Sequence, residues 1–387
     1  MFKKSMIPLA LVAIIAVLSL LVAGCGEKAD SKELKIGANF EMTGGVATFG
    51  QSAVNGIKLA FKEANTGGGI LGKQLSLVVA DNKSEASEAV NAATKLITQD
   101  KVKAVLGPVT SSNTLAQSKI AHENKVPFIT PTGTNPKITV DGGKVQDFAF
   151  RACFIDPFQG TVMANFASKS LKAKTAAVYI DNSSDYAKGL AEFFEKAFVA
   201  AGGQIVSKEA YLAKEQDFKA VLTKIKATNP EVIFIPGYYQ EVGMIAKQAR
   251  ELGITVPLLG GDGWDSPKLV EIAGAAALNN GYFSNHYSSE DKDPRVVKFV
   301  EAYRKEYNQS PDALAALGYD AAVMLIDAIK RANSDDPVKI KEALAQTQNL
   351  QGVSGVITLN AEHDPVKSAV VIELKDGKQV FREKVNP

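Results

Sequence analysis

Short strand patterns alternate with helical patterns along most of this chain, and the alternation occurs in two consecutive series. The first series predicts strands at residues 34–39, 74–81, 102–107 and 127–130, and helices at 51–65, 85–99 and 113–124. In the first of these helices, Val54, Ile57, Phe61 and Ala64 recur on one face. A strand–helix–strand rhythm requires a parallel sheet with helices on both faces, so the predicted fold class is α/β.

The second series predicts helices at 159–171, 186–201, 218–228 and 241–252, and strands at 175–180, 204–211, 232–236 and 257–260. Helical patterns at 294–307, 313–332 and 337–345 follow, and strands at 355–359 and 369–374 end the chain. A single core rarely exceeds about 250–300 residues, and this chain has 387. We therefore expect two doubly wound lobes, joined near residues 150–157.

The first 24 residues resemble a bacterial lipoprotein signal. Lys3 and Lys4 precede an apolar run over residues 6–23, and Leu-Val-Ala-Gly then leads directly into Cys25. In such signals small residues precede the cleavage point, and the cysteine that follows it is lipidated. An uncleaved membrane anchor is the alternative, although the run reaches only the lower end of spanning length, about 17–25 residues. We expect a signal peptide at 1–24, a tether at 25–33, and an extracytoplasmic protein held to the membrane through Cys25.

Charge argues against a nucleic-acid partner. The chain has 44 basic and 42 acidic side chains, and removing Lys3 and Lys4 with the signal leaves 42 of each. No excess of Lys and Arg then remains to neutralise a phosphate backbone. The second cysteine, Cys153, has no partner if Cys25 is lipidated, and its apolar context predicts a buried free thiol.

No motif for catalysis, metal binding or cofactor binding is complete in this sequence. Residues 67–73 match the first seven positions of a phosphate-binding loop, but Gln74 stands where Ser or Thr should bind magnesium. This segment also follows a helix and precedes a strand, so a glycine-rich helix end is the better interpretation. The histidines, His122, His286 and His363, have no metal-like spacing, and surface or core positions are expected for them. We expect no enzyme, no metal site and no cofactor.

Polar residues follow two strands of the first lobe. In open parallel sheets, ligands bind beyond the carboxyl ends of the strands. Ser111, Ser112 and Asn113 follow the strand at 102–107, and Thr132 and Thr134 follow the strand at 127–130. The first three could simply cap the next helix. The same helix start could also bind an anion, so the two clusters together form a plausible carboxylate cradle.

The second lobe offers an acid and aromatic rings at the equivalent edge. Tyr186, Tyr238 and Asp262 all follow predicted strands, and glycines flank Asp262. The carboxylate could pair with an ammonium group, or it could be an ordinary turn aspartate. The rings could cover an apolar ligand or pack in the core. With the cradle of the first lobe, these residues indicate a cleft for a small zwitterion.

Eight segments resemble the periplasmic leucine/isoleucine/valine-binding protein family of ABC transporters. They are residues 67–73, 107–114, 130–136, 150–151, 158–160, 185–189, 236–239 and 260–263, and the resemblance extends from about residue 34 to 375. It implies the type I periplasmic binding fold, in which two α/β lobes are joined by a hinge of three crossovers. One lobe should comprise residues 34–152 plus about 285–352, and the other residues 153–284 plus about 353–387.

The resemblance also implies roles for single residues. Ser111 and Thr134 match positions that hold the ligand carboxylate, and Thr132 matches a position whose backbone carbonyl helps to accept the ammonium. Asp262 matches the acid that pairs with this ammonium, although the family often has the longer glutamate there.

Four further positions belong to the expected site. Tyr238 matches a tyrosine at the carboxylate, and Tyr186 matches one that covers the ligand. Phe49 matches an aromatic residue of the side-chain pocket, and Val109 lies in the loop before Ser111. None of these positions carries Arg or Lys, which argues against an acidic ligand side chain.

The predicted function is therefore capture of an L-amino acid, branched-chain or otherwise apolar, between two closing lobes. The protein, expected to be a monomer, would deliver the ligand to an ABC permease in the cytoplasmic membrane. The same fold could instead bind an aromatic acid, urea or an amide, or serve as a ligand sensor. A transcriptional regulator shares this architecture, but it would need an N-terminal DNA-binding helix pair and no export signal.

Overall fold

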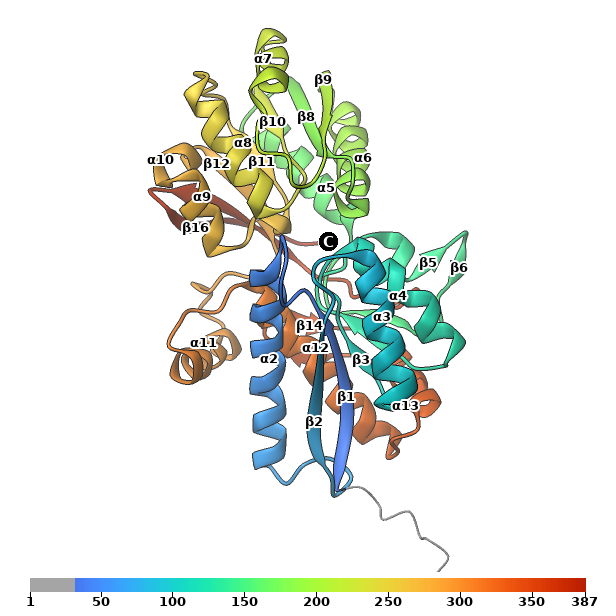
Figure 1. The fold of residues 1–387 in the computed structure, drawn as a ribbon. Helices are drawn as coiled ribbons and strands as arrows, with labels where there is room; N and C mark the ends of the chain where they lie inside the picture. Colours follow the sequence, from blue (N-terminus) through green and yellow to red (C-terminus); the bar gives the residue numbers. More distant parts are fainter. Residues whose placement is uncertain (1–31) are drawn as a thin grey trace, which may run out of the picture.

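The computed structural model describes residues 32–387 and contains two large sheets, one below the other in Figure 1. The lower sheet is fully parallel, with strand order β2-β1-β3-β4-β7. Its strands are β1 (Glu33–Phe40), β2 (Gln74–Asp81), β3 (Val105–Leu106), β4 (Phe128–Thr130) and β7 (Ala149–Arg151). A small hairpin, β5 (Val140–Asp141) and β6 (Lys144–Val145), precedes β7.

Helices cover both faces of this lower sheet (Figure 1). On one face lie α2 (Ala47–Thr66) and α12 (Ala313–Ala332), and on the other lie α3 (Ala86–Thr94) and α4 (Ser111–Glu123). α13 (Pro337–Ala345) packs against α12, and α11 (Pro294–Tyr307) contacts α2. Gly56 and Gly318 allow α2 and α12 to touch through their backbones, because a Cβ at either position would lie 2.0–2.3 Å from a carbonyl oxygen of the other helix.

The upper sheet has seven strands in the order β16-β15-β12-β11-β10-β8-β9. The parallel strands are β8 (Thr175–Asp181), β9 (Gln204–Tyr211), β10 (Val232–Phe234), β11 (Leu258–Gly260) and β12 (Gly281–Asn285). The antiparallel strands β15 (Ala369–Lys375) and β16 (Lys378–Val385) extend one edge, so this sheet is mixed. The predicted α/β class is confirmed, but the second sheet is not purely parallel.

Helices also flank the upper sheet (Figure 1). α5 (Asp156–Asn165) and α6 (Asp185–Ala200) lie on one side. α8 (Tyr239–Glu251), α9 (Pro267–Ala273) and α10 (Ala275–Leu278) lie on the other, with α7 (Lys219–Ala227) beside α8. Strands β7 and β12 were not predicted, because three residues are too short to show alternation and Gly-Tyr-Phe-Ser-Asn has no β-branched residue.

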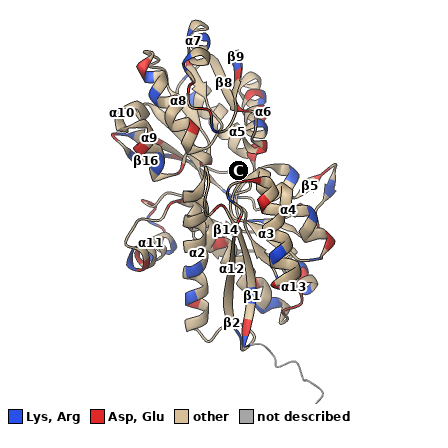
Figure 2. Cartoon of the chain, in the orientation of Figure 1, with Lys and Arg blue, Asp and Glu red and all other residues tan. Residues whose placement is uncertain are grey.

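The chain crosses between the two sheets three times, from β7 to α5, from β12 to α11, and from the hairpin β13 (Leu350–Gly352)–β14 (Gly355–Ile357) to β15. The C-terminus lies at the junction of the two lobes (Figure 1). Basic and acidic side chains are interspersed over both lobes in this view, without a face of one sign (Figure 2).

Two smaller predictions are confirmed. α2 ends at Thr66 in a glycine turn, in which Gly68 and Gly69 have φ values of +103° and +80° that favour glycine. Cys153 is a buried free thiol, and burial raises its pKa to about 12. Cys25 and the predicted signal lie outside the described residues. Within residues 32–387, no helix has the length and apolar character needed to cross a membrane.

A buried guanidinium holds the hinge region together. Arg151, at the end of β7, is fully buried and forms an ion pair with Asp364, with 2.6 Å between Nε and Oδ1. Its remaining nitrogens donate to the carbonyl oxygens of Gly133 and Asn135 and to the hydroxyl of Thr139. Arg151 therefore joins the loop after β4 to the third crossover, which contains Asp364.

Replacing Arg151 tests this role. Arg151→Met leaves the Asp364 carboxylate buried without its cation, which should lower the free energy of unfolding by about 3–5 kcal/mol in a urea titration. Lys62→Met is the control, since its pair with Glu306 is exposed and should contribute at most about 1 kcal/mol. Equal losses in the two variants would contradict the structural role of Arg151.

Candidate ligand-binding site

A narrow enclosed space of about 20 Å³ lies between the two lobes. Seven of the eight predicted ligand-binding residues line it, from loops of both sheets: Phe49, Val109, Ser111, Thr132, Tyr186, Tyr238 and Asp262. Gly263 and Leu314 complete the lining, and the sequence analysis missed both. Leu314, at the start of α12, contributes an apolar side chain that is distant in sequence from every motif.

The start of α4 forms the polar wall on the side of the lower sheet. Ser111 is the first residue of the helix and is 1% exposed, and its Oγ accepts a bond from the Asn135 N–H at 3.3 Å. The capping interpretation of Ser111, Ser112 and Asn113 is wrong, because Thr110 precedes the helix and no side chain caps it. Ser111 lines the cleft and lies at the positive end of the α4 dipole.

A buried carboxylate that sequence reasoning missed shapes this wall. Glu41, just after β1, is fully buried and accepts bonds from the N–H groups of Val109 and Thr110, the Thr110 hydroxyl and the Asn113 amide. Burial raises the pKa of Glu41, and these bonds counteract the rise. By accepting three bonds from the segment before α4 and one from Asn113 in its first turn, Glu41 fixes the position from which Ser111 faces the cleft.

Thr132 and Thr134 follow β4, but they differ in position. Thr132 lines the cleft, and its hydroxyl donates to the Val109 carbonyl at 2.9 Å. Thr134 is fully buried outside the lining of the cleft, and its hydroxyl lies at the carboxyl group of Asp156. Its carbonyl accepts a bond from the Asp156 N–H.

On the upper lobe, Asp262 follows β11 and is 9% exposed. Its Oδ2 lies 2.9 Å from Nε2 of His286, whereas its Oδ1 has no hydrogen-bond partner among the described residues. The backbone N–H of Asp262 donates to Gln159 Oε1 at 2.9 Å. A buried carboxylate oxygen without a donor is costly, so this atom is suited to a cationic group on a ligand.

Aromatic rings cover the same space. Tyr186 and Tyr238 stack with 5.2 Å between their ring centroids, and Phe49 meets Tyr238 edge-on at 5.9 Å. Because Phe49 begins α2 and the tyrosines belong to the upper lobe, this contact spans the cleft. The Tyr186 hydroxyl accepts the Gly263 N–H, which ties the ring to the loop of Asp262. The three rings and Leu314 give the space an apolar side.

Polar contacts join the lobes around the cleft. Ser112 Oγ lies 3.0 Å from Oδ2 of Asp185 and also accepts the Asp185 N–H. Thr48 and Ser266 share a hydroxyl bond at 2.9 Å. At the mouth, Lys214 pairs with Glu85 at 2.7 Å, with both side chains mostly exposed. These polar contacts lie beside the aromatic contact of Phe49 with Tyr238, so both kinds of contact join the two lobes.

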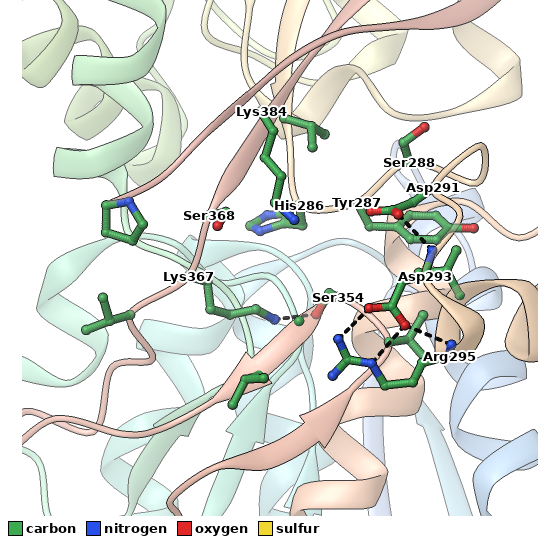
Figure 3. A pocket seen from close by; sticks show the side chains of 17 residues that line it. His286, Tyr287, Ser288, Asp291, Asp293, Arg295, Ser354, Lys367, Ser368 and Lys384 are labelled. Carbon is green, nitrogen blue, oxygen red and sulfur yellow. Dashed lines mark hydrogen bonds and ion pairs between the residues drawn. The ribbon is translucent and has the colours of Figure 1, made fainter.

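A larger cavity of about 340 Å³ lies on the hinge side of the molecule (Figure 3). Two of its charged lining groups pair with each other, since Asp293 binds Arg295 through two atoms, and Lys367 contacts Ser354. His286 also lines this cavity, although its Nε2 bonds to a residue of the cleft. The lining of this cavity carries five charged side chains, including Arg295, Lys367 and Lys384, whereas Asp262 is the one charged residue in the lining of the smaller cleft. The smaller cleft is therefore the better candidate for an apolar zwitterion. Residues 32–387 contain no group of three or more His, Cys, Asp or Glu side chains arranged to bind a metal.

Comparison with known proteins supports the same conclusion. A family model described as periplasmic binding protein matches residues 33–379. The chain belongs to the periplasmic binding protein family. As a member, it is an extracytoplasmic solute-binding protein and not an enzyme.

Individual relatives show which members of this family the chain is similar to. The chain is 31% identical over 353 residues to Leu/Ile/Val-binding protein homolog 3 of Brucella melitensis, covering 91% of this chain and 94% of that protein. The structure of the branched-chain amino acid transporter substrate-binding protein LivJ from Streptococcus pneumoniae, in complex with isoleucine, has a TM-score of 0.87 and 40% identity. The alignment covers 92% of this chain and all of that one.

A third match binds a different kind of ligand. The solute-binding protein of an ABC transporter from R. palustris, in complex with benzoate, has a TM-score of 0.82 and 26% identity, with coverage of 92% and 97%. Shared fold is therefore compatible with ligands that lack an ammonium group, and the choice of ligand has to be argued from the side chains of the cleft.

The buried acid Asp156 leads to a pH prediction. Burial raises the pKa of Asp156 to about 8, so the folded protein keeps a proton that the unfolded chain releases near pH 4. Between these values the folded state binds more protons, and its stability should fall as pH rises. Asp156→Asn removes this dependence: its unfolding free energy relative to wild type should increase by up to about 1.4 kcal/mol per pH unit.

Urea titrations at pH 5, 6.5 and 8 measure this difference. Asp217→Asn, in an exposed loop, is the control and should show no such trend. A stability difference between Asp156→Asn and wild type that is constant with pH would contradict the raised pKa.

Proposed function

We propose that this protein captures an L-amino acid with a branched-chain or other apolar side chain and delivers it to an ABC permease in the cytoplasmic membrane. The observation that carries the proposal is that two unlike polar groups face one small cleft from opposite lobes. Ser111 offers a donor at the start of α4, and Asp262 offers an unpartnered carboxylate oxygen from the opposite lobe. Such a pair matches the carboxylate and ammonium of a zwitterion.

The side of the cleft that would receive the ligand side chain is apolar. Phe49, Val109 and Leu314 line it together with the two tyrosines, and no Arg or Lys is among the lining residues. An acidic side chain would lose hydration here without gaining a cation. The names of the relatives, which include Leu/Ile/Val binding and a bound isoleucine, agree with this chemistry.

Ligand capture requires the lobes to open and close. Ser111, proposed for the carboxylate, lies on the lower lobe, and Asp262, proposed for the ammonium, lies on the upper lobe, so the ligand gains both contacts only when the lobes are closed. This difference in affinity shifts the balance toward the closed form. The closed form is the one we propose docks on the permease, with the protein, as a monomer, tethered through a lipidated Cys25.

Binding of an aromatic acid is the second candidate, because a structural relative holds benzoate. A carboxylate without an ammonium would leave Oδ1 of Asp262 unpaired, so the zwitterion is favoured on the side chains of the cleft.

A thermal-shift screen distinguishes these ligands. The protein from Gly26 onward is unfolded, freed of any co-purified ligand, refolded, and tested with the twenty amino acids and benzoate. Leucine, isoleucine or valine should raise the melting temperature, since a ligand at 100 times its Kd adds about 2.7 kcal/mol to stability. Aspartate and glutamate should not. A shift with benzoate but with no amino acid would overturn the proposal.

Asp262→Ala tests the ammonium partner. Leaving the ammonium buried without its carboxylate should cost about 2–5 kcal/mol, which weakens amino-acid binding by about 30-fold or more in a calorimetric titration. Glu192→Ala is the matched control, because it removes an exposed acid of α6 in the same lobe. Affinity in Asp262→Ala within threefold of the control would refute the assigned role.

A further inference from the structure

His286 lies beside the ammonium-binding candidate, although neither sequence pattern nor family resemblance assigned it a role. It is the first residue after β12, in the second crossover between the lobes. Its Nε2 is 2.9 Å from Oδ2 of Asp262, and the two side chains are 1% and 10% exposed. The pair is therefore almost wholly withdrawn from water.

The imidazole is held in one orientation by its surroundings. It stacks on Phe154 of the first crossover, with 3.7 Å between ring centroids and 27° between planes. The backbone N–H of His286 donates to Oδ1 of the neighbouring Asn285, whose amide in turn donates to Asp265. The stacking on Phe154 and the backbone bond to Asn285 thus fix the place from which Nε2 meets Asp262.

The proton of this ring belongs on Nε2. A carboxylate oxygen only accepts, so the 2.9 Å contact requires Nε2 to donate. Nδ1 is buried and has no partner among the described residues. Burial lowers the pKa of His286, although the nearby Asp262 raises it, so the ring is neutral at pH 7 with Nδ1 unprotonated.

We propose that His286 is a positioning residue, which fixes Oδ2 of Asp262 and thereby presents Oδ1 to the ammonium group of the ligand. The inference rests on the proposed function and deepens it. The side chain of Asp262 accepts its hydrogen bond on Oδ2 alone, so its orientation depends on the contact with His286. A bound ligand gains most when that orientation is set before binding.

A simpler view is that His286 is a core histidine whose bond to Asp262 only stabilises the fold. The two interpretations predict different effects of His286 on the binding of different ligands. A structural histidine affects all ligands alike, whereas a positioning residue affects ligands that have an ammonium group more than analogues that lack it. The measurement is therefore the selectivity between L-leucine and (S)-2-hydroxy-4-methylpentanoate, in which a hydroxyl replaces the ammonium.

The test uses calorimetric titration of three variants with these two compounds. His286→Phe keeps an aromatic ring on Phe154 but removes the donor, and it should weaken L-leucine binding about tenfold while changing binding of the hydroxy acid less than about threefold. His286→Gln retains an amide donor and should restore part of the selectivity. His363→Phe is the matched control, because His363 is also buried and stacks on Phe150 at 4.3 Å, far in sequence from Asp262.

A second measurement does not depend on any ligand or variant. Nitrogen-15 spectra of the histidine rings in the wild-type protein at pH 7 should show His286 protonated at Nε2. Protonation at Nδ1 instead would overturn the proposal, even if His286→Phe does not fold.

The outcomes separate this inference from the function on which it rests. Failure of the wild type to bind L-leucine would overturn both. Binding by the wild type with equal losses for the two compounds in His286→Phe, or with the same selectivity change in His363→Phe, would overturn the role of His286 alone.

Discussion

The buried charge of Arg151 is the constraint on which the geometry of this protein depends. A guanidinium removed from water must have an acceptor for each of its donors, and here these acceptors come from the loop after β4 and from the third crossover. That loop also carries Thr132 and Thr134. The interaction that closes the hinge region therefore also sets one wall of the cleft, and the second wall is set in the same way by Glu41. Buried charged side chains thus fix the backbone of the loops around the cleft, and the polar groups of these loops that they do not bind face the cleft.

The sequence predicted elements best where their ends carry a chemical signal. α11, α12 and α13 have the predicted bounds, since an aspartate caps the start of each and α11 and α12 end at an asparagine in the left-handed region. Strands β7 and β12 carry no such signal and were missed. The α/β class followed from the rhythm of the chain, whereas the antiparallel edge of the second sheet depends on the third crossover, which has no local signature.

The residues of the cleft also divide into those that the sequence predicted and those that it did not. Residues at strand ends, such as Ser111 and Asp262, could be found because the topology of a parallel sheet brings strand ends together. Glu41 and His286 also directly follow strands, but they were not found. Strand β12, which precedes His286, was not predicted, and no motif links either residue to its partner 24 or more residues away. A lone histidine or glutamate in the sequence does not reveal whether it meets a carboxylate, a backbone amide or water. Such partners become visible only when the distances between side chains are known.

The three crossovers also determine the order in which this protein can be completed as it is synthesised. Helix α2 packs on α12, which begins more than 240 residues later, so the face of the first sheet on which both helices lie stays only partly covered through most of translation. The second sheet lacks its edge until β15 and β16 emerge at the end of the chain. Neither lobe can therefore reach its final stability as an early, independent unit, and the chain remains without a finished core until it is nearly full length.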